Sequence, residues 1–195
     1  MSEQAGEAQA LLDFWFGAPG SAGYGQARKA WFVKKPAFDA QVRERFLGLH
    51  GRALAGELAH WEAAPSSLLA LIILLDQLPR NMFRGQPASF AGDPPALAAA
   101  RLMVARGWDA QLPVVMRGFV YLPYEHAEEA MAQDESVRLF AALPAGAERD
   151  DLLEWARKHQ EVIRRFGRFP HRNRILGRDS TPEELAFLAQ PGSRF

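Results

Sequence analysis

The sequence predicts an all-helical protein, on three observations. Apolar residues recur mostly at spacings of three and four, which is the period of an amphipathic helix. Glycine and proline punctuate these segments into eight or nine helices. The stretch 114–122 has a strand-like composition but no evident partner strand, so we expect it to be helical too. With 195 residues and 48% hydrophobic content, the chain is expected to form a single domain, 1–195, around a sizeable core.

Glycine and proline mark the ends of the expected helices near the N-terminus. The first helix covers about residues 7–16 and ends at Gly17, and Pro36 suits the first turn of the second. A short third helix is expected over 53–61. The second helix turns an apolar stripe to the core, formed by Phe38, Val42, Phe46 and Leu49.

An uninterrupted apolar run, 68–75, is expected to be a helix buried on all sides. Ser66 or Ser67, which follow Pro65, would supply its N-cap. Eight apolar residues are too few to cross a bilayer, so this run is a core element. Pro79 lacks a backbone donor, and we expect the helix to end or kink there.

Polar residues follow this run without a linker. In helical geometry Asp76, Gln77, Arg80 and Arg84 would share one face, with Asn81 beside them at the mouth of the buried element. Buried polar groups need partners. Either these side chains contact a ligand, or Asp76 pairs with an arginine while Asn81 caps local backbone.

The remaining helices are bounded in the same way. A helix rich in small residues covers 96–106 and ends at Gly107, and Pro123 is expected to open another that begins at Tyr124. A long helix then ends at Gly167. The last helix is expected to be capped by Ser180 or Thr181, in the sequence Ser180-Thr181-Pro182-Glu183-Glu184.

Opposite charges concentrate in two segments of a chain whose net charge is zero. Residues 164–178 hold six arginines and no acid, whereas residues 124–135 hold five acids and no Lys or Arg. The arginine segment needs an anionic partner, which is a phosphate or carboxylate, a nucleic acid, or the chain's own acids. The arginines alternate with Phe166 and Phe169, but the neutral remainder offers no basic track for nucleic acid, so we do not expect that partner.

Two histidines fall on apolar helix faces. His126 is expected in line with Ala130, Val137 and Phe140 on the helix from Tyr124. His159 follows the apolar rhythm of the next helix. Such residues are commonly hydrogen-bonded core histidines. General acid/base catalysis is the functional alternative, because a buried imidazole near carboxylates and arginines can titrate close to neutrality. His126 and His159 are therefore the candidate catalytic residues.

A metal site is a further alternative. Glu125, His126 and Glu129 lie about one turn apart, and His159 could be a fourth ligand. The Glu-x-x-His pairing is not repeated on a second helix, however, so we expect no metal. No cofactor is expected either, because the glycine-rich segment 17–25 lacks the preceding strand and the Gly-Lys-Ser/Thr of a phosphate-binding loop.

The composition indicates a cytoplasmic protein. Cysteine is absent, which excludes disulfides and cysteine nucleophiles and fits a reducing compartment. Residues 1–7 carry acids where a secretory signal carries positive charge, and no apolar stretch reaches spanning length. We therefore expect neither a targeting peptide nor a membrane partner. The chain also lacks the Gly-x-Ser-x-Gly elbow of serine hydrolases.

Several of these motifs together resemble an uncharacterised bacterial family, the domain-of-unknown-function family 924. The resemblance implies a TPR-like array of antiparallel helix pairs, and it brings no established reaction, substrate or catalytic residue. Ala127 stands where the family's pattern leads us to expect serine, so a hydroxyl contact is missing there. The likeness runs in order over almost the whole chain, through Leu11–Gly17, Leu74–Gly85, the His126 segment, His159–Arg178 and Ser180–Glu184.

Two functional hypotheses follow. In the first, a polar pocket binds a small anionic metabolite bearing phosphate or carboxylate, with or without turnover. In the second, the protein is a non-enzymatic TPR-like scaffold for a protein partner, and its arginines 164–178 pair with acids 125–135. The residues expected to form the pocket are Asp76, Gln77, Arg80, Asn81, Arg84, His126, His159, Arg165, Arg168, His171, Arg172 and Asn173.

Overall fold

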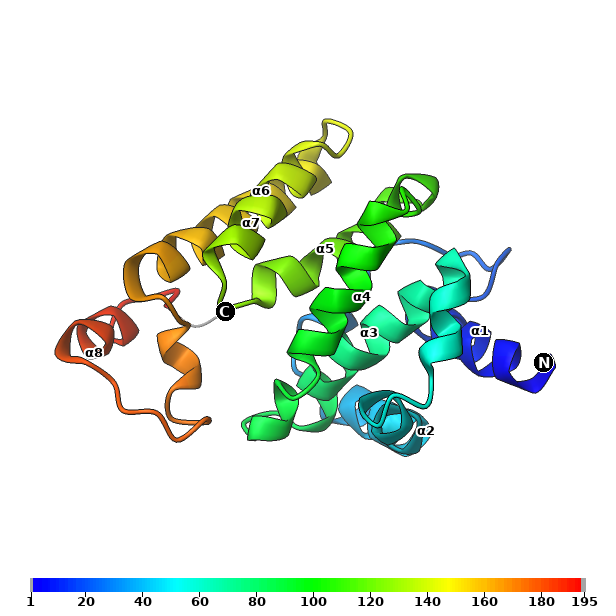
Figure 1. Ribbon diagram of the computed structural model, residues 1–195, viewed down its shortest axis with the longest axis horizontal. Coiled ribbons are helices and arrows are strands. Elements are labelled where there is room, and N and C mark those ends of the chain that lie inside the picture. Colours follow the sequence, from blue (N-terminus) through cyan, green and yellow to red (C-terminus); the bar gives the residue numbers. More distant parts are fainter. Residues whose placement is uncertain (1, 194–195) are drawn as a thin grey trace.

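The computed structural model describes residues 2–193, which form helices and no strand (Figure 1). The all-helical prediction is confirmed, and so is the number of helices. The α-helices are α1 (Ser2–Phe16), α2 (Pro36–Leu54), α3 (Pro65–Met82), α4 (Asp93–Ala105), α5 (Val114–His126), α6 (Ala130–Ala141), α7 (Ala147–Phe166) and α8 (Pro182–Leu188). Short 3-10 helices connect them: η1 (Lys29–Trp31), η2 (Ala59–Ala63), η3 (Pro87–Ser89), η4 (Asp109–Gln111) and η5 (Pro170–Arg172).

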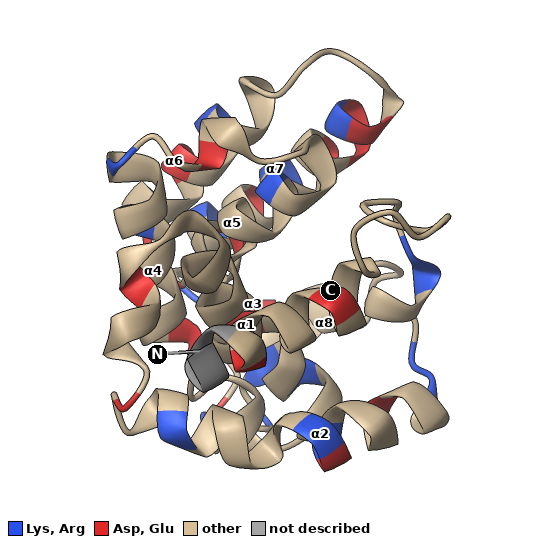
Figure 2. Ribbon diagram, turned by 90° about the vertical axis from the view of Figure 1, so that its right-hand side faces the viewer, with Lys and Arg blue, Asp and Glu red and all other residues tan. Residues whose placement is uncertain are grey.

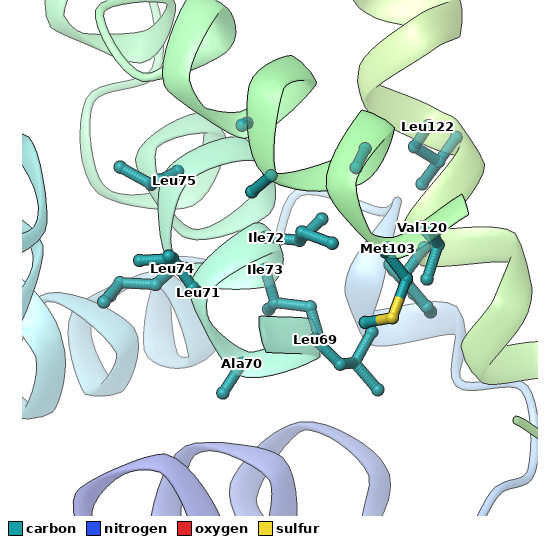
Figure 3. Close-up of a cluster of buried hydrophobic side chains, with 14 of the residues drawn as sticks. Leu69, Ala70, Leu71, Ile72, Ile73, Leu74, Leu75, Met103, Val120 and Leu122 are labelled. Atoms are coloured by element: carbon teal, nitrogen blue, oxygen red, sulfur yellow. The ribbon is translucent and has the colours of Figure 1, made fainter. Parts of the chain in front are cut away.

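Helix α3 is the centre of the main core. It packs against α1, α2, α4 and α5, and every residue from Leu68 to Pro79 is buried (Figure 1). Figure 3 shows Leu69 and Ile72 on the side facing Met103 of α4 and Val120 of α5. Burying such a side chain contributes roughly 1.5–3 kcal/mol, so α3 anchors the fold as its apolar run predicts.

Pro79 lies inside α3, so the predicted helix end at this residue is wrong. The helix continues for three further residues to Met82. Pro79 cannot donate to the carbonyl of Leu75, which is its helical partner position. Gly92, just before α4, packs against that carbonyl so closely that a Cβ there would lie 2.1 Å from the Leu75 oxygen. Tertiary packing thus accommodates the proline within the helix.

Two boundary predictions near the N-terminus are wrong. The separate helix over 53–61 does not exist, because α2 runs on to Leu54 and Gly56 then adopts a left-handed φ of 77° that ends it. Neither Ser66 nor Ser67 caps α3, which already begins at Pro65. Ser67 instead donates its hydroxyl to the carbonyl of Trp61 at 2.7 Å.

The helix expected from Tyr124 onward is divided in two. Pro123 lies inside α5, which ends at His126, and α6 starts only at Ala130. The predicted stripe that joins His126 to the apolar residues of α6 is therefore wrong. The side-chain amide of Gln133, fully buried, donates to the carbonyls of Glu125 at 2.6 Å and Ala127 at 2.8 Å. These bonds satisfy carbonyls that the end of α5 leaves without helical partners.

The C-terminal segment, residues 162–187, has a small core of its own. Val162, Ile163 and Phe169 are buried together, with Phe166 and Phe187 packed against them. Gly167 ends α7 in the left-handed conformation with a φ of 69°, as predicted. Thr181 rather than Ser180 caps α8, in a reciprocal capping box with Glu184.

Helices α6 and α7 pack along one another as a pair (Figure 1). The superhelical TPR-like layout of the whole array stays a prediction. Of the helices in residues 2–193, none combines the length and apolar character that a bilayer-spanning segment needs.

Candidate functional site

The polar end of α3 meets the end of α5 at a buried aspartate–histidine pair. Asp76, 0% exposed, accepts a hydrogen bond from Nδ1–H of His126 at 2.7 Å and another from the amide of Gln77 at 2.5 Å. Arg80, one turn further along α3, lies 3.4 Å from the same carboxylate. Asp76 thereby fixes both the ring orientation and the tautomer of His126, leaving Nε2 as the unprotonated nitrogen.

The electrostatics of this pair keep the aspartate ionised and the histidine neutral. Burial raises the pKa of Asp76, but the positive charge of Arg80 and the hydrogen bonds from His126 and Gln77 to its carboxylate outweigh burial and hold that pKa well below its usual range. Burial and the charge of Arg80 lower the pKa of His126. A neutral imidazole oriented by a carboxylate is equipped to accept a proton at Nε2.

Two arginines share a second carboxylate beside the pair. Asp93, at the start of α4, lies 3.0 Å from Arg80 and 3.2 Å from Nη1 of Arg172 in η5. The guanidinium of Arg172 lies over the rings of Phe90 and Phe169, 4.7 Å and 4.5 Å from their centres. Burial lowers the pKa of Arg172 to about 10, so it remains charged at neutral pH.

A pocket of about 320 Å³ opens beside these groups. Three segments far apart in sequence form it: η3 with the start of α4, the corner between α5 and α6, and η5 with the residues after it. The side chain of His126 is 15% exposed, whereas Asp76 is fully buried, so the Nε2 edge is the one turned to the pocket. The lining residues are Pro87, Phe90, Ala91, Asp93, Pro94, Leu97, His126, Ala127, Glu128, Glu129, Arg172 and Leu176.

A second buried acid–imidazole pair lies next to the first. Oε1 of Glu125 is 3.2 Å from Nδ1 of His159, whose N–H also donates to the carbonyl of Trp155 at 2.9 Å. Burial and the charge of Asp76 raise the pKa of Glu125 to about 8, and burial lowers the pKa of His159 to about 3. The pair is therefore uncharged at neutral pH. The His126 and His159 rings are 6.4 Å apart, but His159 does not line the pocket.

The structure brings together about half of the residues predicted for the site. Arg172 and His126 line the pocket, and Asp76, Gln77 and Arg80 support them from behind. His159 lies in the adjacent pair. The ring of His171 packs against Phe169, with centres 5.7 Å apart, and burial lowers its pKa to about 4.

The other predicted residues do not converge on the pocket. Asn81 and Arg84 both donate to Asp39 of α2, at 2.8 Å and 2.7 Å. Arg165 is exposed, with its guanidinium 4.7 Å from the centre of the Phe166 ring. Arg168 and Asn173 donate to Glu184 of α8, at 2.7 Å and 3.1 Å. These residues were assigned to one site because charge pattern does not reveal which acid each will meet.

Asp93, Phe90 and Glu128 are among the lining residues that the sequence prediction missed. Asp93 precedes the helix predicted over 96–106 and was overlooked, although Gly-Asp-Pro-Pro is a helix-start signal that places an acid beside the apolar face. Phe90 carried no sequence signal. Glu128 was seen only as one of several acids, yet it accepts from Arg178 at 2.6 Å and from the backbone N–H of Phe169 at 2.7 Å.

Two other arrangements are less suited to ligand chemistry. Within residues 2–193, no group of three or more His, Asp and Glu side chains is placed to hold a metal ion. A slightly larger pocket of about 350 Å³ lies between α1, the start of α3 and the start of α5. Asp13 is its charged lining residue, and its floor is formed by apolar side chains such as Leu12 and Phe16.

The fold and the site define a class: an all-helical protein with a buried Asp–His pair at the floor of a small pocket. The model of the family described as "Bacterial protein of unknown function (DUF924)" matches residues 11–192, so the chain belongs to this family. It is similar to a solved structure of the protein of unknown function ATU0120 from Agrobacterium tumefaciens, with 39% sequence identity and a TM-score of 0.84. The similarity covers 95% of this chain and 98% of the other. No curated protein matches the chain.

Proposed function

We propose that the protein binds a small anionic metabolite in the 320 Å³ pocket and uses His126 as a general base or acid on it. The observation that carries the proposal is the 2.7 Å hydrogen bond from His126 Nδ1 to the buried carboxylate of Asp76, with the opposite edge of the ring at a pocket. A surface histidine needs no such support, whereas a catalytic imidazole requires a fixed orientation and tautomer.

Arg172 takes the role of anion anchor in this proposal. It lines the pocket, and its Nε, buried, makes no hydrogen bond to a described residue. A buried donor without an acceptor is unfavourable, and a ligand oxygen would satisfy it. Arg84 and Arg168, which the sequence also suggested as anchors, are already paired with Asp39 and Glu184.

A thermal-melt screen of the purified protein tests the proposal. Phosphorylated metabolites, monocarboxylates and dicarboxylates would be compared, because a ligand that binds the native state raises its stability by RT ln(1 + [L]/Kd). A saturable rise in melting temperature is expected with wild type, and a much smaller one with His126→Gln. His60→Gln is the matched control, since His60 is exposed and lies outside the pocket. Wild-type protein that shows no shift with any anion contradicts the proposal.

Turnover is tested on the ligand that the screen identifies. Conversion followed by proton NMR is expected to be lost in His126→Gln and strongly reduced in Asp76→Asn, which keeps the size of the side chain but removes its charge. An unchanged rate of conversion in His126→Gln would contradict the proposed acid–base role of His126, while the proposal that the pocket binds an anion would still stand.

The scaffold hypothesis retains one specific support. Arginines of the 164–178 segment pair with acids of their own chain, such as Arg164 with Asp134 at 2.8 Å and Arg178 with Glu128 at 2.6 Å. Figure 2 shows acidic and basic residues interspersed over the helices rather than gathered on one face.

Arg168→Ala distinguishes a structural role of this arginine from a role in ligand binding. It is expected to lower the melting temperature, because Glu184, 2% exposed, loses its partner, and to leave ligand binding unchanged.

We further propose a cytoplasmic location, supported by the absence of cysteine from the sequence. The balanced net charge supports a protein without a nucleic-acid partner.

A further inference from the structure

The walls of the pocket are largely apolar. Seven of the twelve lining residues have hydrocarbon or aromatic side chains, and five have polar or charged ones. Burying apolar ligand surface against such walls is favourable, whereas burying the hydroxyls of a sugar without partners is costly. The pocket therefore suits a ligand with an apolar body. The apolar wall residues are Pro87, Phe90, Ala91, Pro94, Leu97, Ala127 and Leu176.

The charges at the pocket favour a ligand with a single negative charge. Arg172 is the arginine among the described lining residues, and it already shares Asp93 with Arg80. Two further carboxylates, Glu128 and Glu129, also line the pocket. Their charges are met by Arg178 at 2.6 Å and Arg101 at 2.8 Å. A dianion would bring two negative charges to a pocket lined by three carboxylates, each already paired with arginine, and by one arginine able to hold it, which is unfavourable in a partly buried site.

The position of Arg172 favours a planar oxygen pair. Its side chain is 7% exposed and is held between two aromatic rings, so its guanidinium plane is fixed. A fixed guanidinium matches the two coplanar oxygens of a carboxylate. His126 lines the same pocket.

We infer that the ligand is a small monocarboxylic acid with an apolar body, bound through its carboxylate at Arg172 and through its body on the apolar wall. This inference rests on the proposed function, because it narrows the anionic ligand proposed there to one chemical class. Phosphate esters and sugar acids fall outside it.

Isothermal titration calorimetry with four probes tests this inference. Benzoate, phenyl phosphate and benzamide share one ring and differ in charge, and inorganic phosphate has no apolar body. Benzoate is expected to bind at least about tenfold more tightly than benzamide or phenyl phosphate, because removing an ionic partner or adding a charge costs more than about 1.4 kcal/mol, the equivalent of tenfold. In the series acetate, propionate, butyrate, each added methylene is expected to tighten binding by about fourfold.

Matched variants locate the binding. Leu176→Asp puts a negative charge at the pocket, at a residue that is 36% exposed. It is expected to weaken benzoate binding by about tenfold. Leu185→Asp introduces the same change at an exposed leucine outside the pocket and is expected to leave binding unchanged. Equal effects of the two substitutions would place the binding elsewhere and contradict the inference.

The outcomes separate this inference from the proposed function. Tighter binding of phenyl phosphate or inorganic phosphate than of benzoate overturns the monocarboxylate and leaves an anion site in place. Benzamide binding as tightly as benzoate, or no binding of any probe, contradicts both the inference and the anionic ligand.

Discussion

Asp76 is a carboxylate that stays ionised without exposure to solvent. Its charge is balanced by Arg80 and stabilised by hydrogen bonds from His126 and Gln77. Removing one partner from such a buried group is more damaging than removing a surface ion pair, because the remaining polar groups keep the cost of burial. The residue therefore has a structural role as well as a role in orienting His126.

Asp76→Asn separates these roles. The free energy of unfolding is expected to fall by about 3 kcal/mol, because Arg80 and His126 lose a buried charge. The pKa of His126 is expected to fall further, because the charge of Asp76 raises it in the wild type. Urea unfolding and NMR titration of the histidine ring measure the two effects. Asp39→Asn, at the carboxylate that pairs with Arg84, is the control and should leave the pKa of His126 unchanged.

Glu125 makes stability depend on pH at the alkaline side. Its pKa is about 8 in the fold and about 4.5 in the unfolded chain, so the folded state binds more protons between these values. The free energy of unfolding is therefore expected to fall as pH rises from about 4.5 to about 8, by up to about 1.4 kcal/mol per pH unit. His159, whose folded pKa of about 3 lies below 6.5, has the opposite effect, which is complete above pH 6.5.

Glu125→Gln tests this assignment. Between pH 6.5 and 8 the slope of unfolding free energy against pH is expected to be flatter than in the wild type, because glutamine does not ionise. Denaturant unfolding at several pH values measures it. The exposed Glu154, changed to Gln, is the control. A slope that is equally steep in Glu125→Gln would assign the alkaline limb to another group.

The contact between α3 and α4 involves Pro79 and Gly92. Pro79 leaves the Leu75 carbonyl without its helical donor, and Gly92 occupies the space beside that oxygen. The next residue, Asp93, begins α4 and pairs with Arg80 and Arg172. The close approach at Gly92 therefore sets the position of a pocket residue.

Gly92→Ala is expected to destabilise the protein by about 3 kcal/mol, because the added methyl would lie 2.1 Å from a backbone oxygen in a rigid helix. Gly118→Ala is the matched control. A Cβ at position 118 meets only the side chain of Leu152 at 3.7 Å, so that change should alter stability by less than about 1 kcal/mol. Both are measured by thermal or urea unfolding. A Gly92→Ala protein as stable as wild type would show that α4 can move away without cost.

The presence of the helices could be predicted from the sequence, whereas the break between α5 and α6 could not. Periodicity revealed the buried run 68–75 and the long helix that ends at Gly167. The break after His126 depends on Gln133, whose amide bonds carbonyls in the previous helix. No local sequence pattern indicates a contact of this kind. The same limit applies to the site: Asp76, Arg80 and His126 were identified, but only the tertiary fold decides that Arg84 meets Asp39 and Arg168 meets Glu184.

At the scale of the whole molecule, polar contacts at the pocket join the C-terminal segment to the rest. The segment has its own small core, and Glu128 links it to the α5–α6 corner through Arg178 and the N–H of Phe169. Arg172 adds a contact to Asp93 of α4. We therefore expect the part of the chain that closes the pocket to open locally more readily than the main core.

Glu128→Ala is expected to loosen this segment without unfolding the protein. Hydrogen bonds to a charged group contribute about 1.5–3 kcal/mol, so amide exchange in residues 167–180 should accelerate by about tenfold or more. Exchange in α3 should not change. Hydrogen–deuterium exchange mass spectrometry measures both, with Glu129→Ala, at an exposed pair with Arg101, as the control. Equal acceleration in α3 would show that the segment and the main core unfold as one unit.

The three-part construction of the pocket has a consequence for the newly synthesised chain. A ribosome that has synthesised the polypeptide through α5 has made both residues of the Asp76–His126 pair, but neither Arg172 nor Leu176. If the proposed ligand binds at Arg172, the chain can recognise it only late in translation, after the central helix of the apolar core has been made. A chain interrupted before η5 would lack this arginine, so truncated products are expected not to compete with the finished protein for the proposed ligand.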